Sequence, residues 1–253
     1  MKVLQQLPSL KLTGITADSR EVKEGYAFVA VKGGTVDGHD LIDQVRKAGA
    51  KFVIGERGAV DETVPDSREA LALLADAFYG HPSRAMKMVG VTGTSGKTTT
   101  TYVIEAILEA AGLKAGVLGT VNFRFGGKVL PSTHTTPGPV ELQKLLAEMR
   151  DGGCEAVVME VSSHALKQKR TLGIAFDAMV FANLTPEHLD FHPDMEDYFR
   201  SKALLFTDYV RDALAAGKLP FASINGDDPY GARLLEELRM HSPPGTGIAG
   251  YGI

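Results

Sequence analysis

Short apolar segments separated by turn residues make up the first part of the chain. Two of them, Tyr26–Val31 and Lys51–Ile54, have the length and residue types of buried strands. Two others, Leu41–Ala50 and Ser67–Tyr79, repeat apolar residues at helical spacing, and the serine that opens the second is its predicted N-cap. The run Gly80–Ser83 then breaks the helical pattern. We therefore predict a small α/β unit over residues 1–84.

From Met86 onward, apolar runs alternate with amphipathic stretches. The runs resemble buried strands and lie at Met86–Val91, Ala115–Leu118, Ala156–Val161, Ala178–Phe181 and Phe221–Ile224. The amphipathic stretches have helical spacing and lie at Thr98–Ala111, Pro139–Arg150, Met195–Val210 and Pro229–Met240. This alternation predicts a second α/β unit over residues 85–253, with a mostly parallel sheet flanked by helices. Ligands of such sheets bind at the carboxyl ends of the strands.

Composition places the chain among ordinary globular proteins. Hydrophobic residues make up 44% and charged residues 23%, which excludes a disordered or membrane-embedded chain. The net charge of −4 argues against nucleic acid as a partner. The single cysteine, Cys154, allows no intramolecular disulfide and favours a reducing compartment. No apolar run has the length of a membrane span, so we expect a cytoplasmic protein without membrane insertion.

The segment Met88–Thr101 has the features of a phosphate-binding loop. An apolar strand leads into glycines, and Lys97 and Thr98 open a helix. Glycines let backbone N–H groups approach phosphate oxygens, and the helix N-terminus attracts anions. Lysine at this position can reach the β- and γ-phosphates, while the threonine hydroxyl can bind Mg²⁺. The general motif G-x-x-x-x-G-K-[ST] requires glycine at its first position, where this chain has Val91.

The loop instead resembles that of the Mur ligase family, which has the form G-T-x-G-K-[ST] and here reads Gly93–Thr98. Further segments match the family in order along the chain: Asp18–Arg20, Asp37–Asp40, Thr135–Pro137, Glu160–His164, Asn183–Asp190, Ser201–Lys202 and Ile224–Asp228. The Glu160–His164 and Asn183–Asp190 segments most resemble the branch of the family that adds the third residue to UDP-N-acetylmuramoyl-L-Ala-D-Glu.

The resemblance implies a domain for the UDP-linked substrate followed by an ATP-binding central domain. The family's third domain, which binds the incoming amino acid, has no counterpart in this sequence. Because Ile248–Ile253 looks like the start of another strand, we expect a fragment that cannot complete peptide synthesis alone. The family motif that separates diaminopimelate from lysine lies in the missing part.

The resemblance also implies a reaction of peptidoglycan precursor synthesis. ATP phosphorylates a substrate carboxylate to an acyl phosphate, and the amine of a diamino acid displaces phosphate to form an amide. The expected partners are UDP-N-acetylmuramoyl-L-Ala-D-Glu and a diamino acid, and a monomer is expected. A relative that extends other carboxylates, such as a folylpolyglutamate or cyanophycin synthetase, stays open as an alternative, and so does a non-catalytic nucleotide-binding module.

Two Mg²⁺ ions are implied by the resemblance, because the transferred phosphoryl group is highly charged. Thr98 and Glu160 match one set of ligands, while His188 and Lys202 match the second. The lysine matching Lys202 is carbamylated by CO₂ in the family, which converts a cation into an anion. Together with Lys97, the residues Glu160, His188 and Lys202 are the expected catalytic groups.

The remaining family positions divide between nucleotide and substrate. The expected nucleotide contacts are Gly93, Thr94, Ser95, Gly96, Lys97, Thr98, Thr99 and Asn183. The expected contacts of the UDP-muramoyl-peptide are Ser19, Thr135, Thr136, Ser162, Gln168 and Arg170. An arginine such as Arg170 suits a carboxylate or pyrophosphate, because its guanidinium can bind in a bidentate way. His134 stands where related enzymes often have asparagine.

Overall fold

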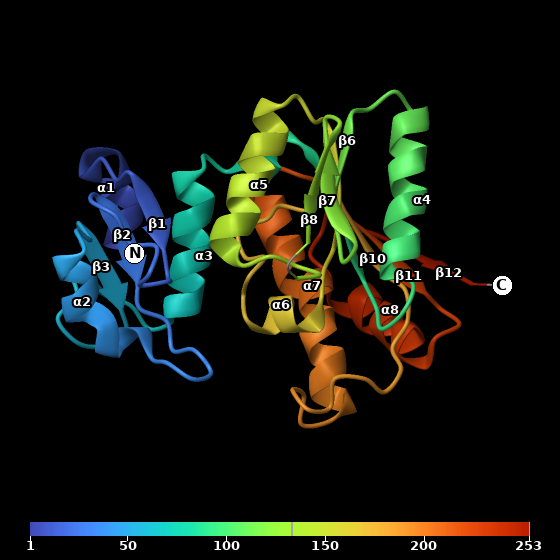
Figure 1. The fold of residues 1–253 in the computed structure, drawn as a ribbon. Helices are drawn as coiled ribbons and strands as arrows, with labels where there is room; N and C mark the ends of the chain where they lie inside the picture. The colour runs from blue at the N-terminus through green and yellow to red at the C-terminus, as the bar shows by residue number, and fades with distance from the viewer. Residues whose placement is uncertain (133, 253) are drawn as a thin grey trace.

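The computed structural model describes residues 1–132 and 134–252. Two sheets, each with its own helices, follow one another along the chain and lie side by side (Figure 1). Within the described residues, no helix combines the length and apolar character that a membrane crossing requires. The predicted α/β class is confirmed.

The N-terminal unit is a four-stranded parallel sheet in the order β1-β2-β3-β4. Its elements are α1 (Lys2–Leu10), β1 (Gly14–Thr16), β2 (Tyr26–Val29), the 3-10 turn η1 (Gly38–Leu41), α2 (Ile42–Lys47), β3 (Phe52–Gly55), β4 (Glu62–Thr63) and α3 (Ser67–Phe78). Both predicted strands and both predicted helices are present, with α2 shorter than expected. The sequence pattern did not indicate α1, β1 or β4, because each is too short to show a clear period.

Helix α3 begins one residue after its cap. The side chain of Asp66 accepts hydrogen bonds from the backbone amides of Arg68 and Glu69, so Asp66 is the N-cap. The prediction that Ser67 is the N-cap is wrong. Ser67 is instead fully buried, and its amide donates to Glu56. A carboxylate caps better than a buried hydroxyl because it also complements the helix dipole.

A short turn, η2 (Pro82–Ala85), joins the two units. The ammonium group of Lys218, which lies near the start of β11, donates to the carbonyl oxygens of Ser83, Met86 and Ala175 and to the carboxylate of Asp177. Three of these four acceptors are backbone carbonyls outside any strand. Lys218 therefore fixes the connection to the second sheet.

The second unit has eight strands in the order β12-β11-β10-β5-β9-β6-β7-β8. Its strands are β5 (Lys87–Thr92), β6 (Ala115–Leu118), β7 (Asn122–Phe125), β8 (Lys128–Pro131), β9 (Ala156–Glu160), β10 (Ala178–Phe181), β11 (Phe221–Asn225) and β12 (Gly247–Tyr251). Its helices are α4 (Lys97–Ala110), α5 (Pro139–Asp151), α6 (Ser163–Lys167), α7 (Met195–Ala215) and α8 (Pro229–His241). All pairs are parallel except β6-β7 and β7-β8.

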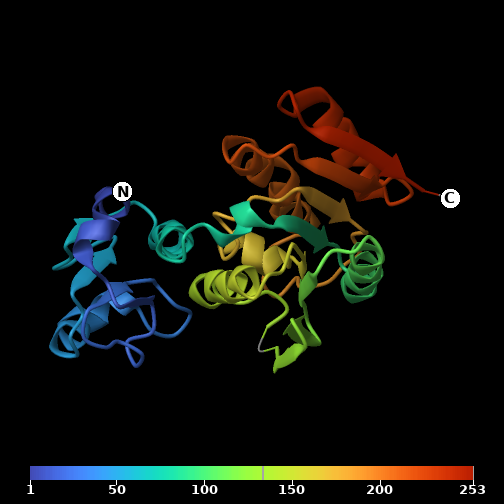
Figure 2. The ribbon, with the colours of Figure 1, turned by 90° about the horizontal axis from the view of Figure 1, so that it is seen from above.

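Helices cover both faces of this sheet (Figure 2). Helix α4 packs on the face that presents Val91, Val117 and Val158, whereas α5, α7 and α8 cover the opposite, larger core. All five predicted strands and four predicted helices are found. The hairpin β7-β8 was not predicted because its strands are short, although the Gly126-Gly127 turn with positive φ is a typical hairpin signal. The predicted final strand, Ile248–Ile253, corresponds to β12, and its last residue, Ile253, lies outside the described residues.

Candidate active site

The phosphate loop lies at the carboxyl end of β5, in the middle of the sheet. Gly93 and Gly96 have φ values of +156° and +82°, which favour glycine. A Cβ on Gly93 would approach that of Ala182 to 2.9 Å, so the loop packs closely against the neighbouring strand end. Ser95, Gly96 and Thr99 are exposed, and the amino end of α4 therefore opens to solvent where an anion can reach it.

Two lysines converge on this loop from different helices. Lys97 Nζ donates to the carbonyl oxygens of Gly93 and Thr94, both at 2.8 Å, and Lys202 Nζ donates to that of Gly93 at 2.9 Å. Burial lowers the pKa of Lys97, while attraction to Glu160 opposes the shift. Burial also lowers the pKa of Lys202 to about 7, with repulsion from Lys97 acting in the same direction. The structure thus brings both predicted lysines to the loop.

Asn183 holds the backbone of the phosphate loop. Its Oδ1 accepts from the amide of Ser95 at 2.9 Å, and its Nδ2 donates to the carbonyl of Ser95 at 3.1 Å. Its own backbone carbonyl accepts from the amide of Thr94 at 3.0 Å. The side chain of Thr94 exchanges further hydrogen bonds with the backbone of Thr185. The geometry therefore makes Asn183 a residue that shapes the loop through its backbone.

Glu160 ends β9, beside β5, and its side chain is almost fully buried. The hydroxyl of Thr98 donates to Oε1 at 2.9 Å, and the amide and hydroxyl of Thr120 donate to Oε1 and Oε2, also at 2.9 Å. These three donors are neutral, although Lys97 attracts the carboxylate at longer range. Thr98 and Glu160, the expected ligands of one Mg²⁺, are therefore in direct contact.

His188 lies on the segment after β10, with a φ of +57° and a side chain 43% exposed. Its ring packs edge-on against His164 and Tyr198, at centroid distances of 4.8 and 6.1 Å. Tyr198 also lies 4.6 Å below the ammonium of Lys202. Tyr198 therefore contacts both His188 and Lys202, the two residues expected on one metal ion. Among the described residues, no group of three or more His, Cys, Asp and Glu side chains is placed to hold a metal ion.

The expected substrate contacts cluster beside Glu160. The buried Thr136 hydroxyl donates to the Glu160 carbonyl at 2.9 Å and accepts from the amide of Ser162 at 3.1 Å. Arg170 donates twice to Gln168 Oε1, at 2.9 and 2.6 Å, and once to the Thr136 carbonyl. Burial lowers the pKa of the Arg170 guanidinium, and repulsion from Arg68 adds to this. The structure thus connects four of the predicted substrate residues.

A cavity of about 300 Å³ opens between the two units, next to these residues. Arg68 and Val31 reach it from the N-terminal unit, while Gln168 and Arg170 reach it from the central unit. The cavity is lined by Val31, Arg68, Leu71, His134, Gly138, Pro139, Gln168 and Arg170. Ser19 follows β1, whose carboxyl end lies at the same sheet edge as that of β2, which leads to Val31. The two arginines make this cavity suited to an anionic ligand.

Sequence reasoning missed two residues of the site, Thr120 and Tyr198. Thr120 holds both oxygens of Glu160, and Tyr198 contacts Thr94, His188 and Lys202. A signal for Thr120 existed, since it follows the apolar run Ala115–Leu118 by two residues and polar groups after parallel strands meet at one edge. Tyr198 gave no comparable signal, because an aromatic residue on an amphipathic helix is usually part of the core.

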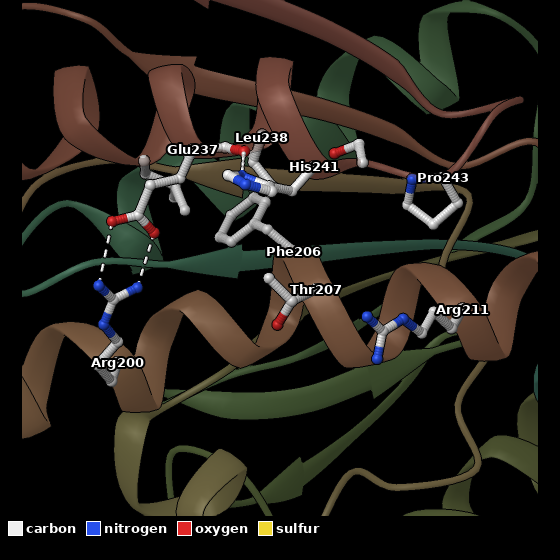
Figure 3. Close-up of a pocket in the computed structure, with 10 residues that line it drawn as sticks. Arg200, Phe206, Thr207, Arg211, Glu237, Leu238, His241 and Pro243 are labelled. Atoms are coloured by element: carbon white, nitrogen blue, oxygen red, sulfur yellow. Dashed lines mark hydrogen bonds and ion pairs between the residues drawn. The ribbon is translucent and has the colours of Figure 1, made fainter.

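Another cavity, of about 390 Å³, lies between α7 and α8 (Figure 3). Its apolar floor includes Phe206, and the ion pair between Arg200 and Glu237 closes one end. None of the predicted site residues lines it. The cavity is therefore separate from the phosphate loop despite its size.

The fold and the loop together define a phosphate-loop α/β protein with a second, smaller α/β unit. Comparison with family models gives two matches. The Mur ligase middle domain matches residues 91–249, and the catalytic domain of the Mur ligase family matches residues 11–79. The chain therefore belongs to the Mur ligase family, as the resemblance of its motifs indicated.

The chain is similar to other ligases of this family. A UDP-N-acetylmuramoyl-L-alanyl-D-glutamate–2,6-diaminopimelate ligase from Geobacter sulfurreducens is 49% identical over 89% of this chain and 45% of its own length. A solved structure of a ligase with the same description has a TM-score of 0.80, at 26% identity over 95% of this chain and 48% of that one. The MurF ligase of Thermotoga maritima in complex with ADP has a TM-score of 0.56, at 28% identity over 100% and 52%. The chain spans about half the length of these relatives.

Proposed function

We propose that this chain forms the substrate- and ATP-binding part of a ligase that adds a diamino acid to UDP-N-acetylmuramoyl-L-Ala-D-Glu. One observation carries the proposal. The exposed phosphate loop, the Thr98–Glu160 pair and the Thr136–Ser162–Arg170 cluster lie at one edge of one sheet. A nucleotide and an anionic peptide bound there would meet end to end. The names of the relatives favour 2,6-diaminopimelate as the diamino acid.

ATP is the proposed nucleotide. The open amino end of α4 offers backbone N–H groups to phosphate oxygens, and the relative solved with ADP has the same fold. Lys97 now donates to two carbonyl oxygens of its own loop, and a phosphate would compete for that ammonium group. We assign Gly93–Thr99 to the phosphates, and Asn183 to holding this loop in shape.

Mg²⁺ fits the Thr98–Glu160 pair. Carboxylate and hydroxyl oxygens are the hard ligands that Mg²⁺ prefers, and Glu160 is a buried anion whose close partners are all neutral. Bound there, Mg²⁺ would neutralise charge on the transferred phosphoryl group. Lys97, which is attracted to Glu160, would share this task.

Lys202 suits a carbamate for a chemical reason. With its pKa lowered to about 7 by burial, a large share of the side chain is the free amine at neutral pH. The amine nitrogen attacks the carbon of CO₂, a C–N bond forms, and one proton leaves to solvent. The product is an anion with two oxygens, which would replace the present bond to the Gly93 carbonyl. We propose His188 as its partner on a second Mg²⁺.

The chemistry that these groups serve is an acyl phosphate route. The D-Glu carboxylate attacks the γ-phosphorus of ATP, and the bond from that phosphorus to the bridging oxygen of ADP breaks. The amine of the diamino acid then attacks the acyl carbon, and inorganic phosphate leaves with the loss of one proton. Thr135, Thr136, Ser162, Gln168 and Arg170 would orient the muramoyl-peptide, and Ser19 would contact the uridine diphosphate.

Calorimetric titration tests the proposal with two ligands. The 253-residue chain is expected to bind ATP in the presence of MgCl₂ and, separately, UDP-N-acetylmuramoyl-L-Ala-D-Glu. Lys97→Ala should weaken ATP binding at least about tenfold, as loss of a charge-assisted bond to phosphate would. Lys114→Ala, on an exposed lysine after the same helix, should not change it. Binding of ATP with no binding of the UDP-linked peptide would instead favour the non-catalytic nucleotide-binding module.

A further inference from the structure

Thr120 occupies the rim of the carboxylate site. It follows β6 through Gly119, and β6 pairs with β9, which ends at Glu160. A Cβ added to Gly119 would lie 2.5 Å from Glu160 Oε1, so this turn wraps tightly around the carboxylate. Thr120 itself is exposed, whereas Glu160 is almost fully buried. A ligand that approaches the carboxylate from solvent therefore passes Thr120.

The hydroxyl of Thr120 lies between the two halves of the site. Its Oγ1 is 2.9 Å from Glu160 Oε2, on the proposed Mg²⁺ side, and 3.0 Å from Thr135 Oγ1, on the proposed substrate side. A hydroxyl has one proton and can donate it to only one acceptor at a time. When Thr120 donates to Glu160, the Thr135 proton is used to donate to Thr120. When Thr120 donates to Thr135, the Thr135 proton is free to point elsewhere.

We propose that Thr120 is a positioning residue that couples the binding of Mg²⁺–ATP to the binding of the UDP-muramoyl-peptide through this single proton. The inference rests on the proposed function of the site. A cation at the Glu160 carboxylate would compete with the Thr120 proton for Oε2, because Oε1 already accepts from the Thr98 hydroxyl and the Thr120 amide. Thr120 then donates to Thr135, and the Thr135 hydroxyl becomes available to donate to an acceptor of the peptide. Each ligand thereby favours the arrangement that the other needs.

Such a coupling is reciprocal. If the peptide raises the affinity for Mg²⁺–ATP by some factor, Mg²⁺–ATP raises the affinity for the peptide by the same factor. Because the peptide gains one hydrogen bond from a neutral hydroxyl, we expect a factor of about 2 to 10. Thr98 and the Thr120 amide keep their bonds to Glu160 in both arrangements, so the carboxylate itself does not need to move.

A calorimetric cycle on the 253-residue chain tests the proposal. The affinity for the non-hydrolysable analogue AMP-PCP with MgCl₂ is measured with and without UDP-N-acetylmuramoyl-L-Ala-D-Glu, and the peptide affinity is measured with and without AMP-PCP. The unsubstituted chain should show the coupling factor in both directions. Thr120→Val keeps the shape and the backbone amide but removes the hydroxyl, so the factor should fall to about one. Thr120→Ser should restore it.

Two further variants separate coupling from stability. Thr135→Val should abolish the factor as well, and combining it with Thr120→Val should cause no further loss of coupling. Thr207→Val, on α7 at the other cavity, should leave the factor unchanged. A Thr120→Val chain that binds both ligands with the coupling intact overturns the inference, even if both affinities fall. Binding of both ligands without coupling in the unsubstituted chain overturns it too, while leaving the proposed function in place. Failure to bind either ligand overturns both.

Discussion

Lys97 and Lys202 donate to the same acceptor, the carbonyl oxygen of Gly93, over distances of 2.8 and 2.9 Å. One lysine comes from the helix that follows the phosphate loop, and the other comes from α7, far along the sequence. Two ammonium groups on one carbonyl repel each other, and the Lys202 side chain is 1% exposed. The loop therefore holds a cation, Lys202, whose protonation is costly in the folded state.

Substitution of Lys202 by methionine should stabilise the chain at low pH. Burial, followed by repulsion from Lys97, lowers the pKa of Lys202 to about 7, whereas an unfolded lysine keeps a pKa of about 10.4. Below pH 7 both states bind the proton, and the folded state bears the full cost of the buried cation. Between pH 7 and about 10.4 only the unfolded state binds it, so the stability of the unsubstituted chain rises with pH.

At pH 6, removal of the buried cation in Lys202→Met should raise the free energy of unfolding by roughly 2–4 kcal/mol. Loss of the hydrogen bond to the Gly93 carbonyl should offset about 1 kcal/mol of this gain. The gain should shrink as the pH rises from 7 to 10. Chemical unfolding in CO₂-free buffer measures it, so that no carbamate contributes. Lys144→Met, on an exposed position of α5, is the control and should show a difference independent of pH. A loss of stability at pH 6 for Lys202→Met would contradict the proposed cost.

Asn183→Ala should weaken nucleotide binding without unfolding the chain. The substitution removes one acceptor and one donor that hold the backbone of Ser95, at 2.9 and 3.1 Å. Two hydrogen bonds of this kind contribute about 1–3 kcal/mol together, so the Kd for ATP with MgCl₂ should rise about 5- to 100-fold. Asn122→Ala, at a residue that binds Arg124 in β7, should leave the Kd unchanged. An unchanged Kd for Asn183→Ala would show that the loop keeps its shape without the amide.

The parallel sheet and its phosphate loop could be predicted from local patterns alone. Apolar runs such as Ala115–Leu118 and Ala178–Phe181 coincide with strands, because strands buried on both faces have continuous apolar sequences. These features depend on sequence periods and on the fixed geometry of parallel sheets. The pairing of Thr98 with Glu160 came from the family resemblance, and the structure places the two side chains in direct contact.

What depended on side-chain placement could not be predicted. Asp66 and Ser67 are both good capping residues, and only the burial of Ser67 decides between them. The contact of Tyr198 with both His188 and Lys202 depends on the path of an irregular segment after β10, for which the sequence has no period. Family resemblance placed His188 and Lys202 in one site, but residue types alone could not show that Tyr198 contacts both.

The N-cap of α3 provides a test of the contact between the two units. Burial opposes ionisation of Asp66, but hydrogen bonds from Lys169 and from the amides of Glu69 and Arg68 outweigh it and lower the pKa. Lys169 lies in the central unit and reaches Asp66 at 2.8 Å. A carboxyl group with a lowered pKa stabilises the fold above its unfolded pKa, and this stabilisation is lost as the pH falls.

Asp66→Ala should lower the free energy of unfolding by about 1–2 kcal/mol at pH 7, the usual cost of losing a cap. The difference should decrease as the pH falls into the acidic range where the carboxyl group of the unsubstituted chain becomes protonated. Asp66→Asn keeps a capping oxygen and should cost less. Lys169→Met should cost under about 1 kcal/mol, because the pair is partly exposed. Thermal unfolding measures each difference across this pH range. Asp43→Ala, in the first turn of α2, is the control and should change stability little at any of these pH values.

Arg170→Lys should separate the substrate side of the site from the nucleotide side. The guanidinium donates twice to Gln168 Oε1 and once to the Thr136 carbonyl. These bonds fix the plane of the guanidinium beside the cavity between the units. Lysine keeps the charge but cannot form a bidentate pair with a carboxylate or pyrophosphate. The Kd for UDP-N-acetylmuramoyl-L-Ala-D-Glu should therefore rise about 10- to 100-fold, since hydrogen bonds to charged groups contribute about 1.5–3 kcal/mol. The Kd for ATP should stay within about twofold, because none of these hydrogen bonds reaches the phosphate loop.

Gln168→Leu extends this test of Arg170, because it keeps the arginine but removes the oxygen that orients it. We expect an intermediate loss of affinity for the UDP-linked peptide, again without change for ATP. Arg211→Lys, on an arginine whose side chain is 72% exposed on α7, is the matched control. Equal losses for both ligands would point to a disturbed fold. Unchanged peptide affinity in both variants would remove Arg170 from the substrate site and leave the cavity between the units without its proposed anion ligand.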